Sequence, residues 1–100
     1  MSMESDLLKH TIRLRAQSVR DLAEGKNRTL DLAIFMDEIA TTKDDEEDLR
    51  TAIIFFAGAL RALASVEHKG TNEMDIMMQS RLLLEDIGKD DLVKKYYGAD

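Results

Sequence analysis

The sequence of 100 residues contains no cysteine, no proline and no tryptophan. Without thiols, the chain cannot form a disulfide, use a cysteine nucleophile or bind zinc through thiolates. Without proline, no segment is interrupted by a residue that lacks an amide proton. The five glycines stand almost entirely between segments of periodic apolar residues. The composition therefore excludes thiol chemistry and favours helices joined by short turns.

Long hydrophobic segments are also missing. The longest uninterrupted apolar run, from Ala52 to Leu60, is ended by Arg61 and is shorter than the ~20 residues of a membrane-spanning helix. The polar, acidic N-terminus lacks the apolar stretch of a secretory signal. A chain of this length, with 44% hydrophobic residues, is typical of one globular domain. We therefore expect a single soluble domain over residues 1–100, located in the cytoplasm and not in a membrane.

Apolar residues recur at steps of three and four through most of the chain, which is the spacing of amphipathic helices. No segment of the sequence alternates β-branched and polar residues as a half-buried strand does. We therefore predict an all-α fold, a compact bundle of four main helices plus a short C-terminal helix. The expected helices cover residues 5–23, 30–41, 42–68, 73–87 and 91–97. The expected N-caps of the second to fifth helices are Asn27 or Thr29, Thr42, Asn72 and Asp90.

The third helix is the expected centre of the fold. Five apolar residues follow one another at steps of four, three, four and three, as on one face of a coiled coil. They are Leu49, Ile53, Phe56, Leu60 and Leu63. This face forms either the core of the domain or the contact of a homodimer. Phe55 and Val66 widen the apolar arc, and Gly58 and Ala62, four residues apart, would let another helix approach closely.

The second and fourth helices carry broad apolar surfaces as well. The second is apolar over most of its circumference, which predicts burial against several neighbours. The fourth has two apolar faces, one centred on Ile76 and Leu83 and the other made of Met74, Met78 and Leu82. The methionine face is covered either by the first and last helices or by another molecule, and methionine suits adaptable contacts.

The net charge of −6 is concentrated in the middle of the chain, where residues 31–50 include eight acidic and two basic residues. Five consecutive carboxylates precede the apolar segment of the third helix. They are Asp44, Asp45, Glu46, Glu47 and Asp48. Such a run is either a solvated helix start or a negative patch for a basic partner. Because negative charge opposes binding to phosphate backbones, we expect a protein partner with a basic surface and no direct contact with nucleic acid.

The sequence shows no catalytic or metal-binding pattern. His10 and His68 are its only histidines, and neither belongs to a cluster of several ligand types at helical spacing, as in a metal site. Glycine-rich phosphate-binding motifs are missing. Alternate acids from Asp44 to Asp48 have the spacing of a calcium loop, but Leu49 stands where that loop requires glycine. We therefore expect no enzymatic activity, no cofactor and no metal.

In size, acidity, expected helicity and lack of catalytic residues, the chain resembles the small phage-encoded inhibitors of bacterial defence, including anti-CRISPR proteins and acidic DNA mimics. The resemblance is one of general character and includes no defining motif. It implies that residues 44–48, with Asp37 and Glu38, occupy a basic groove meant for nucleic acid. The alternative hypothesis is a structural or adaptor subunit that self-associates, for example as a homodimer, through Met74, Met78 and Leu82.

Overall fold

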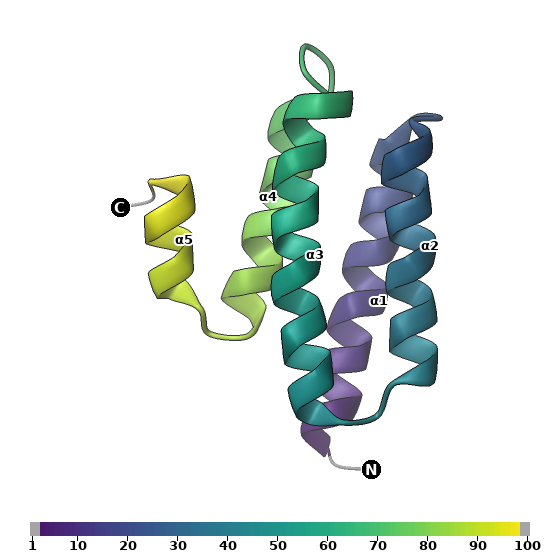
Figure 1. The fold of residues 1–100 in the computed structure, drawn as a ribbon, viewed down its shortest axis with the longest axis vertical. Helices are drawn as coiled ribbons and strands as arrows, with labels where there is room; N and C mark the ends of the chain where they lie inside the picture. Colours follow the sequence, from purple (N-terminus) through teal and green to yellow (C-terminus); the bar gives the residue numbers. More distant parts are fainter. Residues whose placement is uncertain (1–2, 99–100) are drawn as a thin grey trace.

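Five helices form the fold. The computed structural model describes residues 3–98, and this part of the chain contains no strand. The helices are α1 (Met3–Ala23), α2 (Asn27–Thr42), α3 (Glu46–Glu67), α4 (Glu73–Asp86) and α5 (Asp90–Tyr97) (Figure 1). The prediction of an all-α fold with four main helices and a short C-terminal helix is confirmed.

The four long helices form two layers. Figure 1 shows α2 and α3 lying over α1 and α4. The closest pairs are the hairpins α1–α2 and α3–α4, and α3 also packs against α1 and α2. The described Cα atoms span 42 × 32 × 15 Å, as expected for two helical layers whose axes are about 8–10 Å apart. α5 packs against α4 at one side of the molecule, so both broad faces of the bundle stay open.

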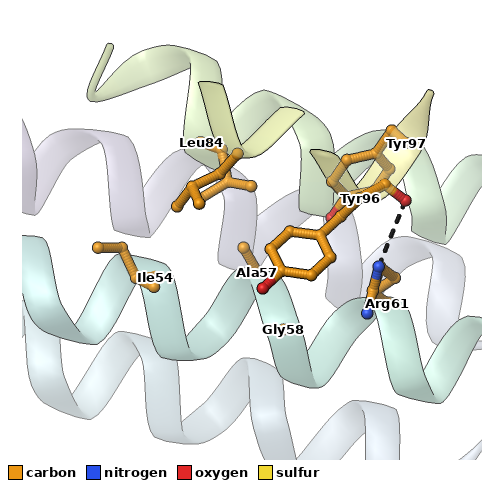
Figure 2. Close-up of a pocket in the computed structure, with 8 residues that line it drawn as sticks. Ile54, Ala57, Gly58, Arg61, Leu84, Tyr96 and Tyr97 are labelled. Atoms are coloured by element: carbon orange, nitrogen blue, oxygen red, sulfur yellow. Dashed lines mark hydrogen bonds between the residues drawn. The ribbon is translucent and has the colours of Figure 1, made fainter. Parts of the chain in front are cut away.

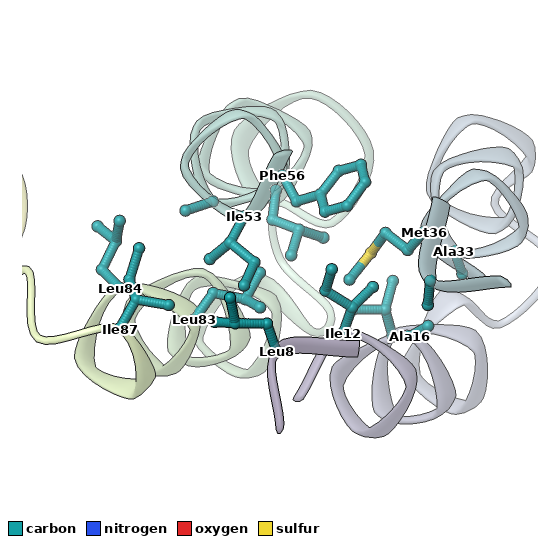
Figure 3. Packing of buried hydrophobic residues seen from close by; sticks show 14 of the residues in the cluster. Leu8, Ile12, Ala16, Ala33, Met36, Ile53, Phe56, Leu83, Leu84 and Ile87 are labelled. Atoms are coloured by element: carbon teal, nitrogen blue, oxygen red, sulfur yellow. The ribbon is translucent and has the colours of Figure 1, made fainter. Parts of the chain in front are cut away.

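All four long helices contribute to one core (Figure 3). Its large, fully buried side chains from α3 are Leu49, Ile53, Phe56 and Leu60. Ile12 of α1, Met36 of α2 and Leu83 of α4 belong to the same cluster. Burying one such side chain contributes roughly 1.5–3 kcal/mol. Four of the five residues on the heptad-like face of the third helix therefore belong to the core, and the fifth, Leu63, is half-buried. Of the two alternatives left by the sequence, the face forms the core of the domain.

α2 differs from its prediction. Ala33, Met36 and Ala40 face the core, but Ile34 and Phe35 are 50% and 42% exposed. α2 lies at the edge of its layer and packs only against α1 and α3, so its outer side is open to solvent. The expectation of burial against several neighbours is wrong, because a periodic pattern does not reveal how many neighbours a helix has.

The expected N-caps are largely replaced by other contacts. Asp45 caps α3, since its side chain accepts a hydrogen bond from the Asp48 amide at 3.0 Å. Thr42 instead ends α2, where its hydroxyl donates to the carbonyl of Glu38 at 2.8 Å. Asn72 precedes α4 without a side-chain cap bond and donates to the carbonyl of Leu22 in α1 at 3.0 Å. Likewise, Asp90 is the first residue of α5 and not its N-cap.

The start of α2 is capped from the end of α3. The carboxylate of Glu67 accepts hydrogen bonds from the amides of Arg28 (3.1 Å) and Thr29 (2.8 Å) and from the Thr29 hydroxyl (2.7 Å). His68 Nε2 lies 2.8 Å from the same hydroxyl oxygen. Because the single hydroxyl proton goes to Glu67, the imidazole donates this bond. Neither Asn27 nor Thr29 supplies the expected side-chain cap; a carboxylate from the other hairpin holds the positive end of α2.

Electrostatics support this contact. Burial acts to raise the pKa of Glu67, but the hydrogen bonds from Thr29 and Arg28 and the neighbouring His68 outweigh it. The pKa of Glu67 is therefore lower than its ordinary value of 4.5. The carboxylate is held in its charged form, which is the form that caps α2.

Candidate protein-interaction surface

Three of the five consecutive carboxylates have partners within the chain. Lys9 in α1 donates to Asp44 Oδ1 at 2.7 Å, and this hydrogen bond, together with the charge of Lys9, lowers the pKa of Asp44. Asp45 caps α3, and Glu46 lies 3.5 Å from the guanidinium of Arg50. The run therefore ties the α2–α3 turn to α1 and begins a helix, which are both structural roles.

The other predicted acidic residues also include some with a partner in the chain and some without. Asp37 forms an ion pair with Arg20 of α1 at 2.9 Å. The side chains of Glu47 and Asp48 are exposed, as is Glu38. These three make no ion pair with any residue between 3 and 98. Of the seven predicted acidic residues, three thus have neither an ion pair nor a capping role.

The methionine face of α4 stays uncovered. Met74 is 82% and Met78 48% exposed, while Leu82 is half-buried. α1 and α5 border this face and leave most of it exposed, since Met78 lines one pocket with Leu22 of α1 and another with Tyr97 of α5. Charged side chains interrupt it, however, because Arg81 and Glu85 form an ion pair of 3.0 Å beside the methionines. A broad dry contact would have to bury these charges, which is costly.

A longer apolar surface lies on the outside of α3. Here α3 exposes seven uncharged residues over about four turns, which we call the α3 outer face. They are Thr51, Ile54, Phe55, Gly58, Ala62, Ser65 and Val66. Phe55 and Val66 are 59% and 62% exposed. This face lies opposite the buried residues of the same helix and makes α3 apolar on both sides.

Gly58 has no packing role inside the molecule. A Cβ atom built on Gly58 would meet no other atom within 4 Å, and the φ angle of this helical residue is not positive. Glycine in the interior of a helix is less stable than alanine by roughly 0.5–1 kcal/mol. The close helix approach expected at Gly58 and Ala62 is not made by any helix in the described part of this chain. Nothing in the fold of residues 3–98 accounts for a glycine at this position.

The two sides of the α3 outer face are lined by aromatic residues. On the α2 side, Phe35 packs edge-on against Phe56, with ring centroids 5.8 Å apart, and Phe55 does the same at 5.9 Å. On the α5 side, a groove of about 260 Å³ runs between α3 and α5 (Figure 2). It is lined by Ile54, Ala57, Gly58, Arg61, Leu84, Leu92, Tyr96 and Tyr97.

Arg61 is the only charged residue between Arg50 and Glu67, and its side chain contacts α5. Its Nη1 donates to the carbonyl of Tyr96 at 3.3 Å, and its guanidinium carbon lies 4.5 Å from the centre of the Tyr96 ring (Figure 2). The cation is thereby held at the groove and away from the middle of the α3 outer face, which keeps that face uncharged.

α3 is long and apolar enough to cross a membrane by length and composition alone. Only 33% of its most apolar 18-residue window is buried, and these buried residues form the centre of the core. The same composition is found in the central helix of a bundle. α3 is thus apolar because both its core-facing side and its outward-facing side consist mainly of apolar residues.

The sequence itself contains a signal for this surface. Phe55 and Val66 belong to the wide apolar arc predicted for the core, but the neighbours of α3 cover only part of its circumference. The near absence of charge from Thr51 to Val66 was the informative feature, since an exposed helix face is normally polar.

The histidines take no part in this surface. His68 is buried in the contact with Thr29, and His10 is exposed on α1. Within residues 3–98, no group of three or more His, Asp or Glu side chains is arranged to hold a metal ion. The main feature of the described surface is thus an exposed apolar face beside an apolar groove. Comparisons with family models, with curated proteins and with solved structures find no match for this chain.

Proposed function

We propose that this chain is a non-enzymatic protein-interaction domain that binds a protein partner through the α3 outer face. One observation carries the proposal, namely an exposed and uncharged face on the central helix, built around a glycine that has no role inside the fold. Contiguous exposed apolar surface is typical of interaction sites in soluble domains.

Physical reasons favour α3 over the methionine face of α4. Docking on α3 buries Ile54, Phe55 and Val66 without desolvating a charge, at a gain of about 25 cal/mol per Å² of apolar surface. Docking on α4 would also cover the ion pair of Arg81 and Glu85. The methionine face, proposed from the sequence as the contact, is therefore the weaker candidate.

A photo-crosslinking residue in place of Phe55 tests this proposal. We expect a covalent adduct with a protein when p-benzoylphenylalanine at position 55 is irradiated in the source cell. The matched control replaces Leu7 of α1, which is 56% exposed against 59% for Phe55. Adducts from position 7 alone, or from neither position, would contradict the proposal.

A second candidate function is supported by the charge of the molecule. It is an inhibitor that mimics nucleic acid and blocks a basic surface, as phage anti-defence and anti-CRISPR proteins do. The net charge of −6 and the unpaired carboxylates of Glu38, Glu47 and Asp48 support it. The surface that would act is thus reduced from the seven acids of the original hypothesis to these three.

Ionic strength separates this candidate from the first. Binding of a lysine-rich peptide should weaken steeply between low and moderate salt, because exposed charges are screened. It should weaken further in the triple variant Glu38→Gln/Glu47→Gln/Asp48→Asn and stay almost unchanged in Asp45→Asn, whose carboxylate caps a helix. Salt-independent binding, or full binding by the triple variant, would rule this function out.

A further inference from the structure

We infer that the α3 outer face binds a second copy of this chain, with the two α3 helices antiparallel about a two-fold axis at Gly58. The inference rests on the proposed function and specifies its partner. It follows from the charges at the two ends of the face and from the order of large and small residues along it.

The ends of the α3 outer face carry opposite charges. Glu47 is exposed and lies 11 residues before Gly58, whereas Lys69 is exposed and lies 11 residues after it. At 1.5 Å per residue, Glu47 at the start of α3 lies about 17 Å from Gly58 along the helix. Lys69 lies at the opposite end, in the turn that directly follows the C-cap His68. An antiparallel second copy centred on Gly58 therefore brings Glu47 of each copy to Lys69 of the other. A parallel copy would place like charges together, which is unfavourable.

The order of side-chain sizes agrees with the same axis. Gly58 lies opposite Gly58 of the second copy, and two glycines allow the closest approach of two helices. Thr51 and Ser65 are each seven residues from Gly58, so these small polar side chains meet across the axis. Phe55 lies beside Ala62 of the second copy, so that a large side chain faces a small one. The face is complementary to itself, as a two-fold interface requires.

The size of the contact predicts its strength. A helix of 22 residues offers a strip about 33 Å long and 10 Å wide, or roughly 330 Å² per copy. Stable interfaces bury at least ~600 Å² per partner, so Phe35 and Tyr96 at the two sides of the face must also contribute. We therefore expect a reversible dimer that dissociates in the micromolar range.

Cysteine crosslinking tests the axis directly, because the chain has no cysteine of its own. Under mild oxidation, Gly58→Cys should form a covalent dimer rapidly. Ser65→Cys alone should not, since its two copies would lie about 21 Å apart along the helices, beyond the ~7 Å limit between disulfide-bonded Cα atoms. A mixture of Thr51→Cys and Ser65→Cys should crosslink to each other.

Charge reversal provides an independent test by sedimentation equilibrium. Lys69→Glu should raise the dissociation constant of the dimer about tenfold, as expected for two partly exposed ion pairs lost per dimer. Adding Glu47→Lys to the same chain should restore it. Lys89→Glu, which makes the same change of charge in the α4–α5 turn, is the control and should have no effect.

The outcomes separate this inference from the proposed function. A strict monomer, crosslinking of Ser65→Cys to itself, or a dimer that ignores both charge reversals would overturn the antiparallel pairing. If the Phe55 photo-adduct has the mass of one chain plus a different protein, the face binds another partner, so the inference fails and the proposed function stands. A dimer that is unaffected by Phe55→Glu would overturn both the antiparallel pairing and the proposed function.

Discussion

At the scale of single residues, the most informative positions are those where the residue and its surroundings disagree. Gly58 stands in the middle of a 22-residue helix with open space around its Cβ position. Thr29, by contrast, is a polar residue with no exposed surface, and its hydroxyl is fully used by Glu67 and His68. Glycine at position 58 makes the fold less stable than another residue would, whereas threonine at position 29 is needed for the stability of the fold.

Replacing Gly58 by alanine should stabilise the monomer by roughly 0.5–1 kcal/mol, because alanine restricts the unfolded chain and favours the helix. The open space around the site means that the added methyl group displaces nothing. Urea unfolding at low protein concentration, where the monomer dominates, measures this change. A loss of stability would show that Gly58 is packed more tightly than the structure indicates.

Replacing Thr29 by valine should destabilise the fold by about 1–3 kcal/mol, because the buried imidazole of His68 loses its acceptor and the carboxylate of Glu67 loses a donor. Valine has nearly the same shape, so packing stays intact. The same urea experiment, with Thr51→Val as an exposed control, measures the difference. An unchanged midpoint would show that the contact contributes nothing.

At the scale of elements, α5 is the least firmly attached helix. It packs against α4, and two polar contacts secure its end. The Tyr97 hydroxyl bonds to Ser80, whose own proton goes to the carbonyl of Ala57 at 2.5 Å. Arg61 of α3 holds the carbonyl of Tyr96. The position of α5, and with it the groove beside α3, thus depends on a few side chains.

The variant Tyr97→Phe should loosen α5 while leaving the bundle intact. It removes one hydrogen bond, worth about 0.5–1.5 kcal/mol, and Ser80 keeps its bond to Ala57. Hydrogen exchange should accelerate in residues 90–97 and stay unchanged in the core of α3, because local opening does not require global unfolding. Equal acceleration in both helices would show that α5 is an integral part of the bundle.

At the scale of the whole molecule, the two hairpins are joined by the core and by contacts between distant charges. Glu67 at the end of α3 caps α2, and Lys9 of α1 holds Asp44 at the α2–α3 turn. Both carboxylates have a lowered pKa in the folded chain. The folded molecule therefore binds protons less readily at these sites than the unfolded chain does.

The contribution of Glu67 to stability should consequently disappear in acid. A carboxylate whose pKa is lower in the folded state stabilises it fully above its ordinary pKa of 4.5, and this contribution is lost as the pH falls through the lowered value. The wild type should exceed Glu67→Gln in unfolding free energy near neutral pH, and the two should converge as the pH decreases below about 4.5. A constant difference across this range would contradict the role of the charge.

The sequence by itself determined the number, type and approximate limits of the helices. Apolar periodicity and the turn glycines are local signals, and each helix has to bury one face. The core face of α3, from Leu49 to Leu60, was predicted for the same reason. Gly58 and Ala62 were recognised as a place of close approach, although the sequence did not show whether a helix of this chain would occupy it.

Only the tertiary structure decided which surfaces remain available. Asp44 meets Lys9 across 35 residues, and Glu67 meets Thr29 across 38; no local pattern reveals such pairs. These contacts give structural roles to Asp44, a predicted binding residue, and to Glu67, which caps α2 in place of the predicted N-caps. The outer face of α3 likewise stays exposed because α1, α2 and α4 leave that side of the helix uncovered, and the number of neighbours around a helix is a property of the packed molecule.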